Sequence, residues 1–204
     1  GHDQLTQIQA ELIPQILDQK DTLAIAKTGS GKTAAFALPI LQKIITELGS
    51  KTRCPNKTKS LVLAPTRELA SQTMRVFESY LTDELKDELK LTVVFGGVSK
   101  TAQVESCNEG IDVLVATPGR LLDLAEDEHI SFDECDFLVL DEADMMLDMG
   151  FMADVERVID LLPRKKQTIM LSATMPKAIE RFAENFLVKP IKIEVSKESS
   201  TSKN

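Results

Sequence analysis

The sequence predicts an α/β fold, with a mainly parallel central sheet and helices on both faces. Short apolar runs alternate with longer segments in which apolar residues recur at helical spacing. Six of these runs end abruptly in a small, polar motif that carries glycine, hydroxyl or acidic residues. Buried strands of a parallel sheet have this pattern, and their carboxyl ends share one edge, where open α/β folds bind ligands. The six runs are Leu23–Ala26, Leu61–Ala64, Val93–Phe95, Val113–Ala116, Leu138–Leu140 and Ile169–Leu171.

The segments between these runs predict helices. Thr6 and Gln9 have capping-box spacing, so a first helix is expected from about Thr6 to Asp18. Pro14 lies inside that stretch and disfavours one unbroken helix. A second helix is expected over Ala34–Leu48, after a glycine-rich motif. The other expected elements are helices over Arg67–Leu81, Ser99–Cys107, Leu121–Ala125, Phe151–Leu162 and about Pro176–Phe186, and a last strand over Ile191–Val195.

The length of 204 residues allows one good-sized domain with a full core. We expect that domain over residues 1–195. Gly49–Lys59 is rich in Gly, Pro, Asn, Ser and basic residues, which predicts an exposed connection. Ser196–Asn204 holds no apolar residue, which is the composition of a flexible tail or of the start of an interdomain linker.

Composition and charge exclude several classes of protein. A hydrophobic content of 43% is ordinary for a soluble globular protein, and no apolar run is long enough to cross a bilayer. The net charge of −8 argues against a protein that simply coats nucleic acid, so any such contact would come from a local groove of donors. The three cysteines and two histidines have no metal-ligand spacing, which indicates free thiols in a reducing, cytoplasmic setting.

A phosphate loop is indicated by Ala26–Thr33, which follows the first strand and opens a helix. Its glycines let backbone N–H groups curl around phosphate oxygens, and the helix N-terminus favours negative charge. Lys32 is placed to meet the β- and γ-phosphates, and the Thr33 hydroxyl to ligate Mg²⁺. The alternative is a glycine-rich turn without a ligand, which the Gly-Lys-Thr ending disfavours. The nucleotide-binding residues expected here are Thr28, Gly29, Ser30, Gly31, Lys32 and Thr33.

An acidic motif, Asp141–Asp144, closes a later strand. A carboxylate there would lie beside the phosphate loop, which assigns the metal to Asp141 together with Thr33. Glu142 is the candidate to orient or deprotonate the attacking water, so Lys32, Asp141 and Glu142 form the expected catalytic set. Taken alone, such a run is also typical of a solvated helix start, and its pairing with the phosphate loop favours the metal site.

The segment Ser172-Ala173-Thr174 has two interpretations. Short hydroxyl residues after a strand are common helix caps. The functional interpretation is a hydrogen-bonded link from Ser172 and Thr174 to Asp144, which would couple the metal site to the rest of the molecule.

Together, these motifs resemble the DEAD-box family of ATP-dependent RNA helicases, in that family's order and approximate spacing. The resemblance covers essentially all of residues 1–195 and implies an N-terminal RecA-like domain. Ala26, where the general phosphate-loop pattern has Gly, is what this family usually carries. The resemblance rests on Gln9, Ala26–Thr33, Pro65–Ala70, Gly96-Gly97, Thr117–Arg120, Asp141–Asp144 and Ser172–Thr174.

The resemblance implies binding of ATP and RNA. Gln9 resembles the glutamine that reads the adenine edge, and a carboxamide offers the donor and the acceptor which that edge requires. RNA would be gripped through its sugar–phosphate backbone, without regard to sequence. The alternative for each RNA segment is a tight strand-to-helix turn, with its arginine in a surface ion pair. The residues implied to contact RNA are Pro65, Thr66, Arg67, Gly96, Gly97, Thr117, Pro118, Gly119 and Arg120.

Nothing after Thr174 resembles the family's second RecA-like domain, whose arginine-bearing motif completes the ATP site and is typically worth about 10³–10⁵ in rate. The chain alone is therefore expected to be a monomer that binds nucleotide weakly and hydrolyses it very slowly. The full-length protein would couple ATP hydrolysis to RNA unwinding or remodelling. Two other functions stay open: an adaptor that binds ADP or a protein without chemistry, and an ATPase that acts on DNA or protein. The intact Lys32, Asp141 and Glu142 disfavour the first, and Thr117–Arg120 disfavours the second.

Overall fold

The computed structural model describes residues 4–48 and 54–195, in which seven strands form a single sheet. The strands are β1 (Thr22–Ile25), β2 (Thr58–Leu63), β3 (Leu91–Val94), β4 (Ile111–Ala116), β5 (Phe137–Leu140), β6 (Gln167–Ser172) and β7 (Ile191–Glu194). They lie in the order β3-β4-β2-β5-β6-β1-β7, and every pairing is parallel. The parallel sheet predicted from the six apolar runs and the last strand is confirmed.

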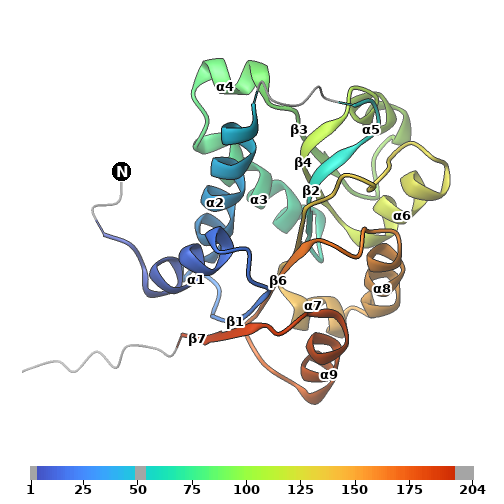
Figure 1. The fold of residues 1–204 in the computed structure, drawn as a ribbon. Coiled ribbons are helices and arrows are strands. Elements are labelled where there is room, and N and C mark those ends of the chain that lie inside the picture. The colour runs from blue at the N-terminus through green and yellow to red at the C-terminus, as the bar shows by residue number, and fades with distance from the viewer. Residues whose placement is uncertain (1–3, 49–53, 196–204) are drawn as a thin grey trace, which may run out of the picture.

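Helices cover both faces of this sheet (Figure 1). One face carries α1 (Gln7–Leu17), α2 (Lys32–Glu47), α3 (Arg67–Ser79) and the short α4 (Asp83–Glu88). The other face carries α5 (Lys100–Cys107), α6 (Pro118–Glu126), α7 (Ala143–Asp148), α8 (Met152–Asp160) and α9 (Lys177–Phe186). The three-layer α/β architecture expected from the sequence is therefore present.

The core consists of two apolar clusters, one on each side of the sheet, because successive strand residues point to opposite faces. In β4, Val113 and Val115 belong to the cluster on the side of α1, α2 and α3, whereas Leu114 and Ala116 belong to the cluster on the other side. All four side chains are fully buried. A strand buried on both faces is apolar over most of its length, which is why these strands were visible in the sequence as short apolar runs.

Several helix boundaries differ from the prediction. The sequence did not predict α4 and α7, whose six residues each are too few to show a helical period. The second helix begins at Lys32 rather than Ala34, because Gly31 in the left-handed conformation directly precedes it. Pro14 does not interrupt α1 and lies on its exposed side. Part of the predicted connection 49–59 forms the start of β2; its residues 49–53 and the predicted tail 196–204 lie outside the described residues.

Asp21 makes hydrogen bonds at the end of the sheet opposite the edge that carries the predicted motifs. Its Oδ1 accepts from the Thr168 backbone N–H at 2.8 Å, and its Oδ2 accepts from the Val188 N–H at 2.7 Å. The residue is 9% exposed. One carboxylate therefore ties the start of β1 to β6 and to the segment before β7.

Replacing this carboxylate is expected to destabilise the domain. In Asp21→Ala two backbone N–H groups lose a charged acceptor, which should cost about 2–4 kcal/mol of unfolding free energy. Urea unfolding followed by circular dichroism measures this as a lower midpoint. The matched control is Asp18→Ala, which removes an exposed carboxylate at the end of α1 and should change the midpoint little. Equal midpoints for the two variants would remove Asp21 from this role.

Two of the three cysteines are buried thiols. Burial raises the pKa of Cys107 to about 11 and that of Cys135 to about 12. Both thiols therefore stay protonated and unreactive near neutral pH.

Among the helices in the described ranges, none has the length and apolar content that crossing a membrane requires.

Candidate functional site

The predicted site residues follow the strands at one edge of the sheet, in two neighbouring groups. The phosphate loop, the acidic motif and Ser172–Thr174 follow β1, β5 and β6, which are adjacent strands. The segments that begin at Pro65, Gly96 and Thr117 follow β2, β3 and β4, which are also adjacent. The pairing of β2 with β5 places the two groups side by side. We refer to them as the nucleotide half and the RNA half of the edge, after the ligands that the sequence predicts for them.

In the phosphate loop, Gly31 occupies a position that requires glycine. Its φ of +85° is left-handed, and a Cβ would lie 2.7 Å from Gln9 Nε2 and 3.0 Å from Thr6 Oγ1. Gln9 Nε2 donates to the Gly31 carbonyl at 3.2 Å, and Gln9 Oε1 accepts from the Thr6 N–H at 3.0 Å. Within the described residues, the buried Ser30 Oγ has no hydrogen-bond partner. A cradle of backbone with a hydroxyl lacking a partner fits a phosphate group.

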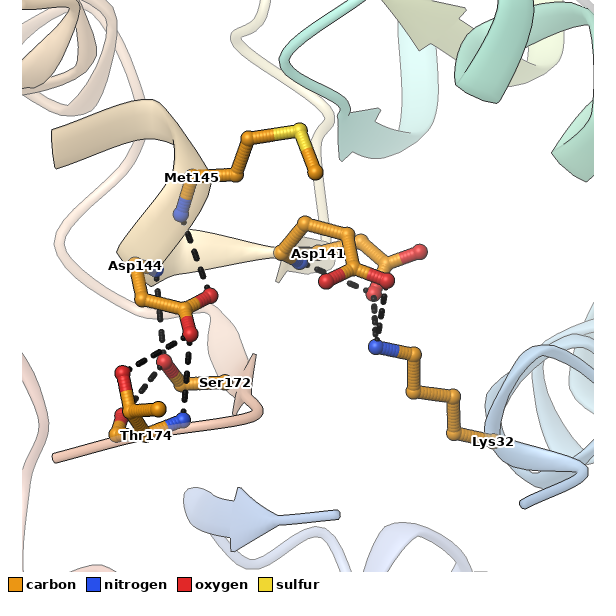
Figure 2. Close-up of polar contacts among 7 residues, drawn as sticks. Lys32, Asp141, Asp144, Met145, Ser172 and Thr174 are labelled. Atoms are coloured by element: carbon orange, nitrogen blue, oxygen red, sulfur yellow. Dashed lines mark hydrogen bonds and ion pairs between the residues drawn. The ribbon is translucent and has the colours of Figure 1, made fainter. Parts of the chain in front are cut away.

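Lys32 lies against two carboxylates, as Figure 2 shows. Its Nζ donates to Glu142 Oε1 at 2.6 Å and lies 3.7 Å from Asp141 Oδ1. Each of the three residues is 5% exposed. Burial raises the pKa of Asp141 to about 6; the positive charge of Lys32 opposes the shift, and the neighbouring Glu142 adds to it. The three residues predicted as the catalytic set are thus in mutual contact.

The backbone of Glu142 is in an unusual conformation. Its φ of 52° and ψ of 49° are left-handed, at the position that precedes α7. Its N–H donates to Asp141 Oδ1 at 3.0 Å. A non-glycine residue held in this region costs on the order of 1–3 kcal/mol and persists where the surroundings impose it. Here the turn brings the Glu142 carboxylate to Lys32 through a backbone conformation that no sequence pattern indicated.

A cavity of about 320 Å³ opens beside these groups. One wall holds Gln9, most of the phosphate loop and the two carboxylates. The opposite wall belongs to α3, which the sequence did not assign to the site. Its only sequence signal was that it begins within the Pro65–Ala70 motif. The lining residues from α3 are Leu69, Gln72, Thr73, Val76 and Tyr80.

Asp144 is joined to the segment after β6, as Figure 2 also shows. Its Oδ2 accepts from the Thr174 N–H at 3.0 Å and from Thr174 Oγ1 at 2.9 Å. Ser172 Oγ accepts from the Asp144 N–H at 3.3 Å and donates to the Thr174 carbonyl at 2.7 Å. Burial raises the pKa of Asp144, but the hydrogen bonds from Thr174, Met145 and Ala173 outweigh it and hold this pKa below its ordinary value. The link between α7 and β6 therefore favours an ionised Asp144.

The three segments of the RNA half contact one another. The Thr117 N–H donates to the Val94 carbonyl at 3.0 Å, and the Arg67 guanidinium lies 5.0 Å from the centre of the Phe95 ring. Thr66 caps α3 by accepting from the Leu69 N–H at 3.2 Å. Of the predicted RNA residues, Arg67, Gly96, Gly97 and Gly119 are exposed, Thr66, Thr117 and Arg120 are half-buried, and Pro65 and Pro118 are buried. The two prolines therefore shape their turns from beneath the surface.

Arg120 is held by a residue that the sequence did not single out. Its Nη1 donates to Gln103 Oε1 at 3.0 Å, and its Nη2 donates to the Val98 carbonyl at 3.1 Å. Gln103 Nε2 in turn donates to the Phe95 carbonyl at 3.0 Å. Gln103 is 8% exposed. One sequence signal could have indicated Gln103: it lies four residues before Cys107, which places a polar side chain on the buried face of α5.

The comparisons with known proteins agree with this geometry. The family model for the DEAD/DEAH box helicase matches residues 6–182. That range contains every site residue predicted above, from Gln9 to Thr174. The chain belongs to the DEAD/DEAH box helicase family, and the resemblance drawn from its motifs is confirmed.

Among curated relatives, the chain is 39% identical over 202 residues to DEAD-box ATP-dependent RNA helicase 35A of Oryza sativa subsp. japonica, covering 97% of this chain and 32% of that protein. It is 40% identical over 204 residues to ATP-dependent RNA helicase DeaD of Mycobacterium tuberculosis, covering 100% of this chain and 35% of that protein. The chain thus spans about a third of the length of these relatives.

Solved structures of the same family have the same fold. A hypothetical ATP-dependent RNA helicase from Sulfolobus tokodaii aligns with a TM-score of 0.83 at 35% identity, over 96% of this chain and 54% of that one. The yeast DEAD-box splicing factor Prp28 aligns with a TM-score of 0.86 at 35% identity, over 95% of this chain and 46% of that one. The RecA-like fold expected from the resemblance is confirmed.

Proposed function

We propose that this chain is the ATP- and RNA-binding half of a DEAD-box RNA helicase. Joined to a second RecA-like domain, it would couple ATP hydrolysis to the unwinding or remodelling of RNA. The observation that carries the proposal is Lys32 in contact with Asp141 and Glu142 beside a glycine cradle. Family membership and the names of the relatives favour RNA over DNA or protein as the target. The proposal includes a monomer in the cytoplasm, where buried thiols such as Cys107 and Cys135 persist.

The residues present fit ATP with Mg²⁺. Gly29, Gly31 and Lys32 line the cavity and offer backbone N–H groups and an ammonium group to phosphate oxygens. The Thr33 hydroxyl and the Asp141 carboxylate also line it and are oxygen ligands of the kind that Mg²⁺ takes. When bound, the ion neutralises charge on the β- and γ-phosphates. Lys32 would exchange Glu142 for phosphate oxygens, which leaves the Glu142 carboxylate able to accept a proton from the attacking water.

Gln9 keeps the capacity to read a base. A carboxamide has two N–H donors and an oxygen with two lone pairs. The bonds to Gly31 and Thr6 use one donor and one lone pair. One donor and one acceptor therefore remain for the adenine edge, and the same side chain connects the base site to the phosphate loop.

The hydrogen bonds that join Asp144 to Ser172 and Thr174 would couple changes at the metal site to the second domain.

Arg67 offers the direct test of the RNA half. It is exposed at the first position of α3, and its guanidinium lies over the Phe95 ring beside Gly96. In Arg67→Ala, the dissociation constant for short single-stranded RNA is expected to rise about three- to tenfold at low salt, whatever the sequence. The salt dependence should become shallower by about 0.7 in the slope of log affinity against log salt, the value for one phosphate contact on a single strand.

Fluorescence anisotropy with two labelled RNAs of unrelated sequence measures this effect. Arg75→Ala, which removes an exposed arginine further along α3, is the charge-matched control. A loss confined to one RNA sequence would contradict recognition of the backbone. Failure of the unaltered chain to bind either RNA, or to bind ATP, would overturn the proposed function itself.

A further inference from the structure

We propose that Gln103 is a positioning residue for RNA, which shapes the RNA half of the edge without touching the RNA. This inference rests on the proposed function, because that surface is the one proposed to grip RNA. Gln103 lies on α5, and at 8% exposed its side chain is enclosed by protein. Its effect must therefore pass through the groups that it holds.

Its carboxamide joins two of the three RNA segments. The Nε2 donates to the carbonyl of Phe95, the residue directly before Gly96, and the Oε1 accepts from Arg120 Nη1, both at 3.0 Å. One contact needs a donor and the other needs an acceptor. Among side chains of this length, the glutamine amide supplies both in one planar group. A glutamate would place an acceptor against the Phe95 carbonyl, and a methionine would supply neither contact.

The same contacts hold the loop Phe95–Val98 at both of its ends. Gln103 binds the carbonyl of its first residue, and Arg120 Nη2 binds the carbonyl of its last residue at 3.1 Å. Between them, Gly96 and Gly97 are exposed, and a Cβ on either would meet nothing within 4 Å. Glycine loses more backbone conformational freedom on ordering than any other residue, and nothing packs against these two glycines. The anchored ends therefore give the loop a fixed shape before RNA arrives, which lowers the cost of binding.

The third segment is reached through Phe95. Its carbonyl is fixed by Gln103, and its ring supports the Arg67 guanidinium at 5.0 Å. Arg120 is oriented by the Oε1 atom of the same Gln103 carboxamide. A guanidinium has five N–H donors, of which one Nη1 and one Nη2 hydrogen go to Gln103 and Val98. A second hydrogen on each of these nitrogens remains for phosphate, in a plane that the protein has already set.

The test is Gln103→Met, which preserves length and charge and removes both hydrogen bonds. The dissociation constant for short single-stranded RNA is expected to rise about three- to tenfold. The salt slope should stay unchanged, because no charge is lost. The affinity for a fluorescent ATP analogue should also stay unchanged, because the nucleotide half is not touched. Amide hydrogen exchange at Gly96, Gly97 and Val98 is expected to become faster.

The matched control is Asn108→Met, which removes an exposed carboxamide at the end of the same helix and should leave all four readouts unchanged. If Gln103→Met fails to fold, Gln103→Glu keeps an acceptor for Arg120, loses the donor to Phe95 and places a carboxylate oxygen against the Phe95 carbonyl; RNA affinity is then the readout, because the added charge changes the salt slope. Unchanged RNA affinity in the folded variant would overturn the positioning role, and so would a parallel loss of ATP-analogue affinity. Failure of the unaltered chain to bind RNA is a different result, which overturns the proposed function.

Discussion

Glu142→Gln is expected to cut ATP turnover by about 10²- to 10⁴-fold while nucleotide affinity stays within a few-fold. The amide cannot accept the proton of the attacking water, but it keeps an oxygen acceptor for Lys32 Nζ, which lies 2.6 Å from Glu142 Oε1. The change therefore removes proton transfer and preserves most of the site's shape. The left-handed backbone at this position is also open to glutamine, because it depends on the surrounding turn.

The measurement is RNA-stimulated phosphate release by a protein in which this chain is followed by a second RecA-like domain. Fluorescent nucleotide titration of the same protein measures the affinity. Glu156→Gln, on the exposed face of α8, is the matched control and should have normal turnover. Turnover at the unaltered rate in Glu142→Gln would exclude the carboxylate from the chemistry.

Lys32→Met is expected to destabilise the domain by about 3–5 kcal/mol at pH 8, in addition to weakening nucleotide binding. The lysine is the positive charge in contact with Asp141 and Glu142, and all three residues are 5% exposed. Without it, two buried carboxylates face each other. Burial already raises the pKa of Asp141 to about 6, and loss of the lysine raises that pKa further.

The sign of the pH dependence follows from this shift. A carboxyl whose pKa is raised on folding holds its proton in the native state after the unfolded chain has released it. Native stability is then greatest at low pH and falls as pH rises from about 4 through the folded pKa. The deficit of Lys32→Met relative to the unaltered chain should therefore be larger at pH 8 than at pH 5.

Urea unfolding at the two pH values measures that difference. Lys57→Met is the control, because its partner Asp133 is mostly exposed and the loss of a surface pair costs little. Equal deficits for Lys32→Met at both pH values would show that loss of the lysine does not change the pKa of Asp141.

The features that the sequence could predict are those encoded within a few consecutive residues. Most of the strand β4 was visible as the apolar run Val113–Ala116, because both faces of that strand are buried. The phosphate loop was visible because its glycines, lysine and threonine must be adjacent to form one turn. Likewise, the spacing of Thr6 and Gln9 predicted the capping box that begins α1.

Contacts between distant segments could be predicted only in part, as in the link from Asp144 to Ser172 and Thr174, where both partners lie in motifs. Lys32 and Glu142 are 110 residues apart, and the turn that joins them depends on a backbone conformation with no sequence signature. Gln103 acts through a carbonyl and a guanidinium supplied by other elements. The α3 wall of the cavity became evident only once the sheet order had placed that helix beside α2.

The strand order has a mechanical consequence. The loops of the nucleotide half and of the RNA half follow strands of one continuous parallel sheet, and the two groups of strands meet where β2 pairs with β5. A closely packed sheet of this kind deforms little, so neither ligand can pull its own binding loops far from those of the other. If the proposed function holds, this domain would stay rigid, and the movement that separates an RNA duplex would come from the second domain as it closes against this one.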